Sequence, residues 1–225
     1  MNARLLLTGF DPFGGETVNP SAQVAQALDG ERLGDDRVRA QVQSLVLPTV
    51  FGLALRQLNA AVDAALQSEA PPLLLVLALG QAGGRAELSL ERVAINVDDA
   101  RITDNAGAQP VDELVVATGP AAYFSTLPIK AMVAALHAAG HPGSISQSAG
   151  TFVCNHVFYG LQHRLQGTGV RSGFMHLPYV PQQARGKTGM PSVPLEQLID
   201  GTRIALQAAL LHEGADLRWS GGTVA

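Results

Sequence analysis

A short run of apolar residues near the middle of the chain constrains the fold most. Residues 73–79 read Leu-Leu-Leu-Val-Leu-Ala-Leu and stand between Pro71-Pro72 and Gly80. A bounded run of this length is typical of a strand buried on both faces, as at the centre of a parallel sheet that helices cover on both sides. It is far below the length of a membrane-spanning helix. The run therefore predicts an α/β protein built on a parallel sheet.

Strand and helix patterns alternate on either side of this run. Polar residues at 98–110 predict a surface loop, and the tail after Glu213 is expected to be frayed. Asn19 is expected to cap the first helix, with Pro20 at its first position. The order predicts a three-layer α/β/α sandwich around a mainly parallel twisted sheet, with residues 1–225 in one domain. Further strands are predicted at 4–9, 38–46, 93–97, 144–147 and 173–177, and helices at 20–29, 49–68, 128–139, 154–165 and 194–213.

Composition excludes several classes of partner. A net charge of −4, with no stripe of Lys and Arg, predicts no binding to nucleic acid. The first apolar segment breaks at Gly9, too early for a signal peptide, and no segment predicts a membrane span. With a single thiol in the chain, we expect a cytoplasmic protein. Hydrophobic residues make up 47% of the chain, a surplus that could cover an oligomer interface.

Cys154 is the one cysteine, so an internal disulfide is impossible. It is a buried filler, a metal ligand or a nucleophile, and cysteine is among the most buried residue types. Its position at a predicted helix start favours the thiolate, because unpaired N–H groups and the helix dipole stabilise an anion. His176, at the end of the following predicted strand, is a candidate base. Strand, turn and helix together predict that Cys154 and His176 meet in space.

Glu91 is a candidate partner for this histidine. On one alternating strand, Glu91, Val93 and Ile95 would share a face, which would aim the carboxylate toward the core. A buried carboxylate needs a partner. A histidine ring would suit it, because the carboxylate fixes the tautomer and stabilises the imidazolium. A structural ion pair with an arginine is the alternative, and the candidates are Arg85, Arg92 and Arg101.

Other motifs favour no second chemistry. The glycine-rich loops at 9–15 and 80–85 lack the patterns of phosphate-binding and dinucleotide-binding loops. Phe10 and Phe13 in the first loop either fill the core or line an apolar pocket. His137 and His141 have a metal-pair spacing, but Gly140 and Pro142 interrupt the helix and no third ligand is evident. The nucleophile-elbow pattern of serine hydrolases does not occur in the sequence.

Five long segments, taken together, resemble the pyroglutamyl-peptidase I family of cysteine peptidases. They are LLTGFDPFGGETVNPS at 6–21, GQAGGRAELSLERVAINVDDARI at 80–102, GPAAYFSTLPIK at 119–130, AGTFVCNHVFYGL at 149–161 and GFMHLPYVPQQ at 173–183. The resemblance implies a catalytic triad of Glu91, Cys154 and His176. It also implies a single catalytic α/β/α domain acting on N-terminal pyroglutamyl peptides, without cofactor or metal, in a cytosolic homotetramer.

The resemblance further implies roles around the triad. Arg101 is expected near the reacting carbonyl, and Phe10, Phe13, Asn19 and Gln81 are expected to help form the pyroglutamyl pocket, with Phe152 and Val153 beside it. The Cys154 N–H, at the predicted helix start, is a candidate to stabilise the oxyanion together with Arg101. Two alternatives from other classes stay open on the residues alone. One is an enzyme resembling nucleoside phosphorylases, which would need a phosphate site. The other is a non-catalytic binding protein whose thiol is merely buried.

Overall fold

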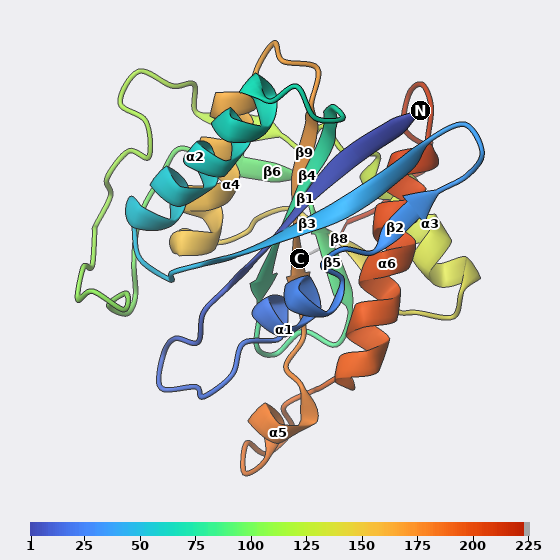
Figure 1. The fold of residues 1–225 in the computed structure, drawn as a ribbon. Helices are drawn as coiled ribbons and strands as arrows, with labels where there is room; N and C mark the ends of the chain where they lie inside the picture. Colours follow the sequence, from blue (N-terminus) through green and yellow to red (C-terminus); the bar gives the residue numbers. More distant parts are fainter. Residues whose placement is uncertain (223–225) are drawn as a thin grey trace.

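A seven-stranded sheet forms the centre of the protein in the computed structural model, which describes residues 1–222 (Figure 1). The strand order is β2-β3-β1-β4-β9-β5-β8. Neighbouring strands are parallel except in the pairs β2–β3 and β9–β5. The predicted mainly parallel sheet is therefore confirmed. Its strands are β1 (Asn2–Phe10), β2 (Arg32–Gly34), β3 (Arg39–Leu47), β4 (Leu73–Gln81), β5 (Leu88–Glu91), β8 (Gly143–Ser146) and β9 (Arg171–Leu177).

Helices cover both faces of this sheet, as Figure 1 shows. Alternate residues of β4 point to opposite faces: Leu75 and Leu77 belong to the core beneath α1, α3 and α6, whereas Val76 belongs to the core beneath α2 and α4. This two-residue period explains why the central strand is apolar throughout. The helices are α1 (Pro20–Ala27), α2 (Leu53–Gln67), α3 (Ile129–Ala138), α4 (Val153–Leu165) and α6 (Leu195–Leu211), with a short α5 (Pro181–Ala184) between β9 and α6.

Helix starts follow local sequence. The Asn19 side chain accepts a hydrogen bond from the Ser21 N–H (3.0 Å), which confirms the predicted cap of α1. Helix α2 begins four residues later than predicted from Thr49, because Gly52 takes the left-handed φ of 66° immediately before it. Residues with a side chain rarely adopt this conformation, so Gly52 fixes where the helix begins.

The predicted strand at 93–97 is wrong in its extent and its sheet. The main-sheet strand β5 ends at Glu91, and β6 (Val93–Ile95) instead pairs with β7 (Ala122–Phe124) in a separate two-stranded sheet. Glu91 is fully buried, whereas Val93 and Ile95 are only half-buried. The inward aim of Glu91 thus comes from β5, and the shared face with Val93 and Ile95 does not exist.

The tail, which was predicted to be frayed, makes specific contacts as far as Gly221. The Asp216 carboxylate accepts hydrogen bonds from the N–H groups of Lys130 (2.9 Å) and Ala131 (3.0 Å), so it caps α3 from a distant part of the chain. Arg92 donates to the Gly221 carbonyl (2.6 Å). The tail is held because it satisfies helix N–H groups that α3's own sequence leaves without a side-chain cap. Residues 223–225, which the same prediction covered, lie outside the described part.

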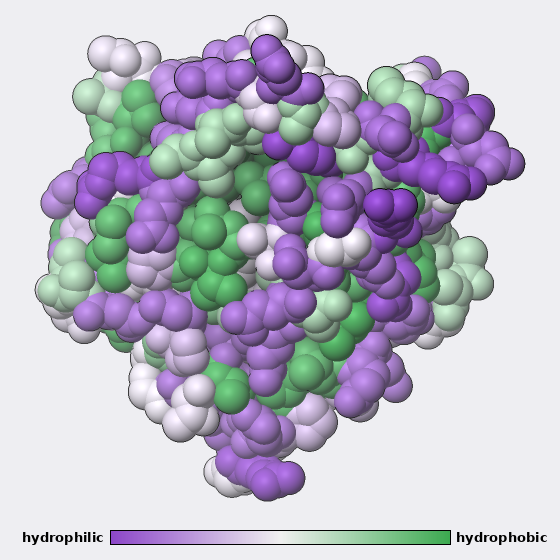
Figure 2. All heavy atoms as spheres, viewed as in Figure 1, coloured by the Kyte–Doolittle hydropathy of each residue, from purple (hydrophilic) through white to green (hydrophobic). Residues whose placement is uncertain are grey.

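The surface is mostly hydrophilic on the face that Figure 2 shows. Figure 2 shows hydrophilic residues spread over most of one face, interrupted by smaller hydrophobic patches, with a mainly hydrophilic projection at the end where Figure 1 places α5. Among the described residues, no helix combines the length and the apolar character needed to cross a membrane.

Candidate active site

A cleft of about 960 Å³ opens where the carboxyl ends of β4 and β9 meet the loops around them. Ligand sites of α/β sheets commonly form at this edge. Cys154 and His176 both line the cleft. The loop after β1 contributes Phe13, and the loop before α4 contributes Phe152. Four segments that are distant in sequence therefore enclose one cavity.

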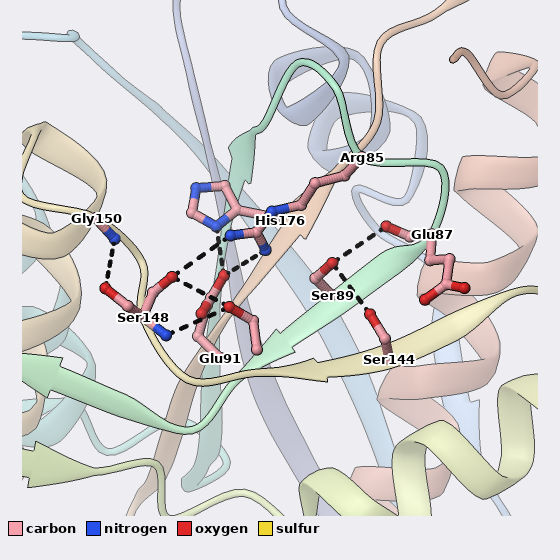
Figure 3. Close-up of polar contacts among 9 residues, drawn as sticks. Arg85, Glu87, Ser89, Glu91, Ser144, Ser148, Gly150 and His176 are labelled. Atoms are coloured by element: carbon pink, nitrogen blue, oxygen red, sulfur yellow. Dashed lines mark hydrogen bonds and ion pairs between the residues drawn. The ribbon is translucent and has the colours of Figure 1, made fainter. Parts of the chain in front are cut away.

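His176 forms a buried pair with Glu91 (Figure 3). The His176 Nδ1 lies 2.7 Å from Oε1 of Glu91. The same oxygen accepts a hydrogen bond from Nη1 of Arg85 at 2.8 Å. Both partners considered for Glu91, a histidine and an arginine, are thus realised together. Because Nδ1 is engaged by the carboxylate, the other ring nitrogen, Nε2, is the one left for chemistry in the cleft.

The surroundings of Glu91 keep it ionised. Burial alone would raise the pKa of this carboxyl. The hydrogen bond from His176 and the charge of that ring lower the pKa, and Ser146 and Arg85 lower it further. The net pKa lies below the ordinary value of 4.5. At neutral pH the carboxylate is therefore charged and able to orient the imidazole.

Gly80 places the Cys154 sulfur beside His176. Gly80 on β4 is the register partner of His176 on β9. Paired residues of neighbouring strands point to the same face. A Cβ atom on Gly80 would lie only 2.9 Å from Sγ of Cys154 and 2.7 Å from the ring of Phe174. The sulfur thus occupies the space that a side chain at position 80 would take, next to the imidazole on the same face of the sheet.

The thiol itself is not ionised in the resting protein, contrary to the sequence-based expectation. Cys154 is the second residue of α4 and is partly exposed to the cleft. Desolvation by the surrounding protein and, to a smaller extent, the charge of Glu91 nevertheless raise the pKa of Cys154 to about 12, although the charge of Arg85 partly opposes them. The helix start is therefore outweighed by burial and by a nearby carboxylate. At neutral pH, Cys154 needs a base to give up its proton.

Backbone donors stand next to the sulfur. Helix α4 has no side-chain cap hydrogen bond at its N-terminal residue, Phe152. The first N–H groups of a helix have no partner within the helix itself. The N–H groups of Val153 and Cys154 are therefore available to a negatively charged oxygen at this end of the cleft. Arg101, which lines the same cleft, is exposed at its edge.

Comparison with known proteins identifies the family. A sequence model described as pyroglutamyl peptidase matches residues 3–212. A pyrrolidone-carboxylate peptidase of Cupriavidus taiwanensis is 57% identical over 222 residues, covering 97% of each chain. The crystal structure of pyroglutamyl peptidase I from Bacillus amyloliquefaciens superimposes with a TM-score of 0.89 at 42% identity, covering 98% of this chain and 100% of that one. The chain belongs to the pyroglutamyl peptidase family.

A third relative extends this similarity. The pyrrolidone carboxyl peptidase from Thermococcus litoralis has a TM-score of 0.88 at 34% identity, covering 97% of this chain and 99% of that chain. These matches confirm the α/β fold and the predicted membership in a family of cysteine peptidases. They favour neither the phosphorylase-like alternative nor the non-catalytic one.

Within this family site, only some of the predicted pocket residues reach the cleft. Phe13, Gln81 and Phe152 line it. The rings of Phe13 and Phe152 lie 5.8 Å apart, and Phe51 meets Phe152 edge-on at 5.3 Å. Aromatic side chains therefore form one wall of the cleft. Phe51 escaped the sequence analysis because it lies in a helix-like segment, far in sequence from the other two rings.

Three of the predicted pocket residues do not line the cleft, namely Phe10, Asn19 and Val153. Phe10 is 2% exposed and packs against Phe174, with ring centroids 6.4 Å apart. Asn19 is 2% exposed and is used by the cap of α1, while its amide donates to the Asp11 carbonyl (3.0 Å). Val153 is fully buried in the core beneath α4. These contacts engage the three side chains in packing and capping, and their expected places at or beside the pyroglutamyl pocket stay predictions.

The remaining histidines of interest have separate partners. His137 Nε2 lies 2.7 Å from the Gly143 carbonyl, and His141 Nε2 lies 2.8 Å from the Asp200 carboxylate. Each of these two histidines thus makes its own structural contact, and the two do not share a ligand. His156 does not line the cleft and forms a buried pair with Asp98.

Proposed function

We propose that this protein removes N-terminal pyroglutamate from peptides, with Cys154 as nucleophile, His176 as acid and base, and Glu91 as the residue that orients His176. Family membership supports the activity. The observation that carries the residue assignment is the buried Glu91–His176 pair, because His176 is the register partner of Gly80, on which the Cys154 sulfur packs.

The cleft suits an uncharged ring. Pyroglutamate has no free amino group, because its nitrogen is a lactam amide. An aromatic wall of Phe13 and Phe152 would contact the ring faces. Gln81 is 8% exposed at the end of β4, and its Oε1 accepts a hydrogen bond from Gln183 (2.7 Å). With Oε1 engaged, the Gln81 amide nitrogen would donate to the lactam carbonyl.

Attack on the substrate requires the Cys154 proton to leave first. Since the pKa of the thiol is raised to about 12, His176 would remove this proton as the sulfur bonds to the pyroglutamyl carbonyl carbon. The carbonyl oxygen would become an oxyanion, held by the N–H groups at the start of α4 with Arg101 beside them. Losing one such donor typically costs about 3 kcal/mol of barrier.

Collapse of this intermediate would split the peptide bond. His176 would return its proton to the leaving amine, so that a thioester to Cys154 and a shortened peptide result. A water molecule, deprotonated by His176, would then attack the thioester. Its collapse would release pyroglutamate and restore the thiol. Each step uses one proton and residues of this chain alone, which is why we propose that no metal or cofactor takes part.

Release of a chromophoric amine from pyroglutamyl amide tests this function. We expect turnover by the untreated protein and its loss after alkylation of Cys154. The matched control substrate is the glutaminyl amide, which has the uncyclised side chain and a charged amine and should be cleaved far more slowly. Equal cleavage of both substrates, or no cleavage of the cyclised one, would contradict the proposal.

We also propose a homotetramer in the cytoplasm. Large apolar side chains are exposed at Val111 (65%), Leu114 (58%) and Phe124 (70%), and further copies of the chain would cover them. A reduced compartment would keep the catalytic thiol free. Light scattering tests the assembly: a monomer at micromolar concentration would contradict it.

A further inference from the structure

Arg85 occupies a position between the cleft and the buried carboxylate. It follows the turn after β4, where Gly84 has a left-handed φ of 89° and lets the chain reverse. Its side chain is 31% exposed and lines the cleft, whereas Glu91 behind it is fully buried. Figure 3 shows Arg85 and His176 approaching Glu91 from different elements. A cation that faces the substrate space on one side therefore contacts Glu91 on the other.

The proposed reaction requires a cation that compensates the buried Glu91 charge throughout, and Arg85 supplies one. A fully buried carboxylate is costly unless a charge compensates it. His176 would be neutral in one half of the cycle and protonated in the other, so it cannot compensate Glu91 throughout. Among the described residues, Arg85 is the one permanently charged side chain that contacts Glu91. With Arg85 in place, Glu91 stays ionised whether or not His176 carries a proton.

Arg85 also reaches the segment that precedes the nucleophile. Its Nη2 lies 3.4 Å from the Ser148 carbonyl, in the loop that leads into α4. The same carbonyl accepts a hydrogen bond from Ser146 Oγ at 3.1 Å, and Ser146 is the register partner of Glu91. One guanidinium thus connects the carboxylate on β5 with the loop before Cys154. This link is longer than the bond to Glu91 and is expected to matter less.

We propose that Arg85 is a positioning residue for the reaction: it holds Glu91 charged and aligned on His176 while the imidazole gains and loses its proton. The inference rests on the proposed peptidase function. It assigns Arg85 a role distinct from that of Arg101, which lies exposed at the cleft edge. A purely structural ion pair would stabilise the fold without influencing how activity depends on pH.

Kinetics of Arg85→Gln, Arg85→Lys and Arg56→Gln test the proposal. Arg56 is an exposed arginine on α2 that does not line the cleft, so its substitution matches the change in charge outside the site. For Arg85→Gln we expect kcat to fall roughly tenfold or more, as for the loss of a charged hydrogen bond, with a smaller change in KM. Glu91 would then be protonated at higher pH, so the acid limb of the kcat profile should move to higher pH. Arg85→Lys should recover part of both effects, and Arg56→Gln should leave both unchanged.

Wild-type kcat in Arg85→Gln, or a loss of kcat that follows thermal stability without a shift of the acid limb, would overturn the proposal. A second readout does not require turnover. Because Arg85 lowers the pKa of Cys154, the rate of alkylation by iodoacetamide at pH 8 should fall severalfold in Arg85→Gln. If the wild-type protein failed to cleave pyroglutamyl amide, the proposed function would fall. The alkylation rates would then decide the coupling between Arg85 and the site: slower alkylation would support it, and an unchanged rate would refute it.

Discussion

Two buried pairs of a histidine and a carboxylate lie on the α4 side of the sheet. In the pair of His176 and Glu91 and in the pair of His156 and Asp98, the ring Nδ1 lies 2.7 Å from a carboxylate oxygen. The difference is at the other ring nitrogen. His156 Nε2 accepts a hydrogen bond from the Gly52 N–H (3.1 Å), whereas His176 lines the cleft beside the Cys154 sulfur.

The comparison teaches which feature gives such a pair a chemical use. Geometry between ring and carboxylate is the same in both, so it cannot identify an active site alone. Both ring nitrogens of His156 make structural hydrogen bonds. They connect Asp98, in the segment after β6, with Gly52, the residue before α2. In the proposed mechanism, His176 keeps one nitrogen free for proton transfer. A free nitrogen next to a nucleophile is therefore the distinguishing observation.

Removing the nucleophile should have the largest effect. Cys154→Ala should lower kcat on pyroglutamyl amide by at least about 10⁴-fold, because no other group can form the covalent intermediate. Circular dichroism and the unfolding midpoint should stay close to wild type, since the side chain is small and partly exposed. Retained turnover in a preparation free of wild-type protein would remove Cys154 from the mechanism.

Replacing each carboxylate by its amide should distinguish the roles of the two pairs most directly. Glu91→Gln should lower kcat by about 10³- to 10⁴-fold, because a neutral amide no longer fixes the tautomer or stabilises the imidazolium. Asp98→Asn should cost about 1–3 kcal/mol of stability while changing kcat per folded molecule by less than about tenfold. Steady-state kinetics and urea denaturation of both variants measure the contrast. The distinction between a catalytic and a structural pair would be refuted if Asp98→Asn were as inactive as Glu91→Gln. It would also be refuted if the ratio of lost activity to lost stability were the same in both variants.

Adding a single methyl group at position 80 should disturb the proposed catalytic site and leave the pair of His156 and Asp98 intact. Gly80→Ala would press a Cβ against the Cys154 sulfur and the Phe174 ring, so we expect kcat to fall about a hundredfold through misplacement of the nucleophile. Gly160→Ala is the matched control: its Cβ would lie 2.3 Å from Leu55, against α2 rather than in the cleft. The control should lower stability and leave kcat per folded molecule unchanged. Equal kinetic effects from the two substitutions would argue against the placement of the sulfur.

The smallest effect concerns alkaline stability. The pKa of Cys154 is about 12 in the folded protein against an ordinary 9.0, so the folded state keeps a proton that the unfolded chain releases. Stability is therefore unaffected by this group below about pH 9 and is lost as the pH rises through about 12. Cys154→Ala should lack this loss, and urea midpoints at pH 8 and pH 10.5 should fall less for the variant. Parallel slopes would mean that the thiol titrates near its ordinary pKa.

Much of the architecture could be predicted from local patterns. The apolar run at 73–79 and the Asn19-Pro20 helix start each depend on neighbours in sequence, and the structure confirms both. The break after Glu91 could not be predicted in this way. Residues 88–97 alternate almost without interruption, and only the pairing of β5 with β8 and β9 decides that the main-sheet strand ends at 91.

The site was less predictable where it depends on contacts between distant residues. Local patterns nominated Glu91, Cys154 and His176 one by one, and the family resemblance implied them as a triad. It did not reveal that Gly80 leaves room for the sulfur, which depends on the register of β4 and β9. The protonation of Cys154 was predicted wrongly because the helix start is visible in sequence, whereas burial and the nearby Glu91 charge are not. The residues alone left Phe10 open between core and pocket; it is the last residue of β1 and is 2% exposed, which only the fold shows.

The contact of Asp216 with α3 has a consequence for how the chain is completed and handled. The cap of this helix is encoded 85 residues after the N–H group of Ala131 that it serves. During translation, α3 emerges long before its cap is synthesised, so any product cut short before Asp216 carries an unfinished helix end. Affinity tags and fusion partners at the carboxyl terminus are best joined beyond Gly221, whose carbonyl is already taken by Arg92.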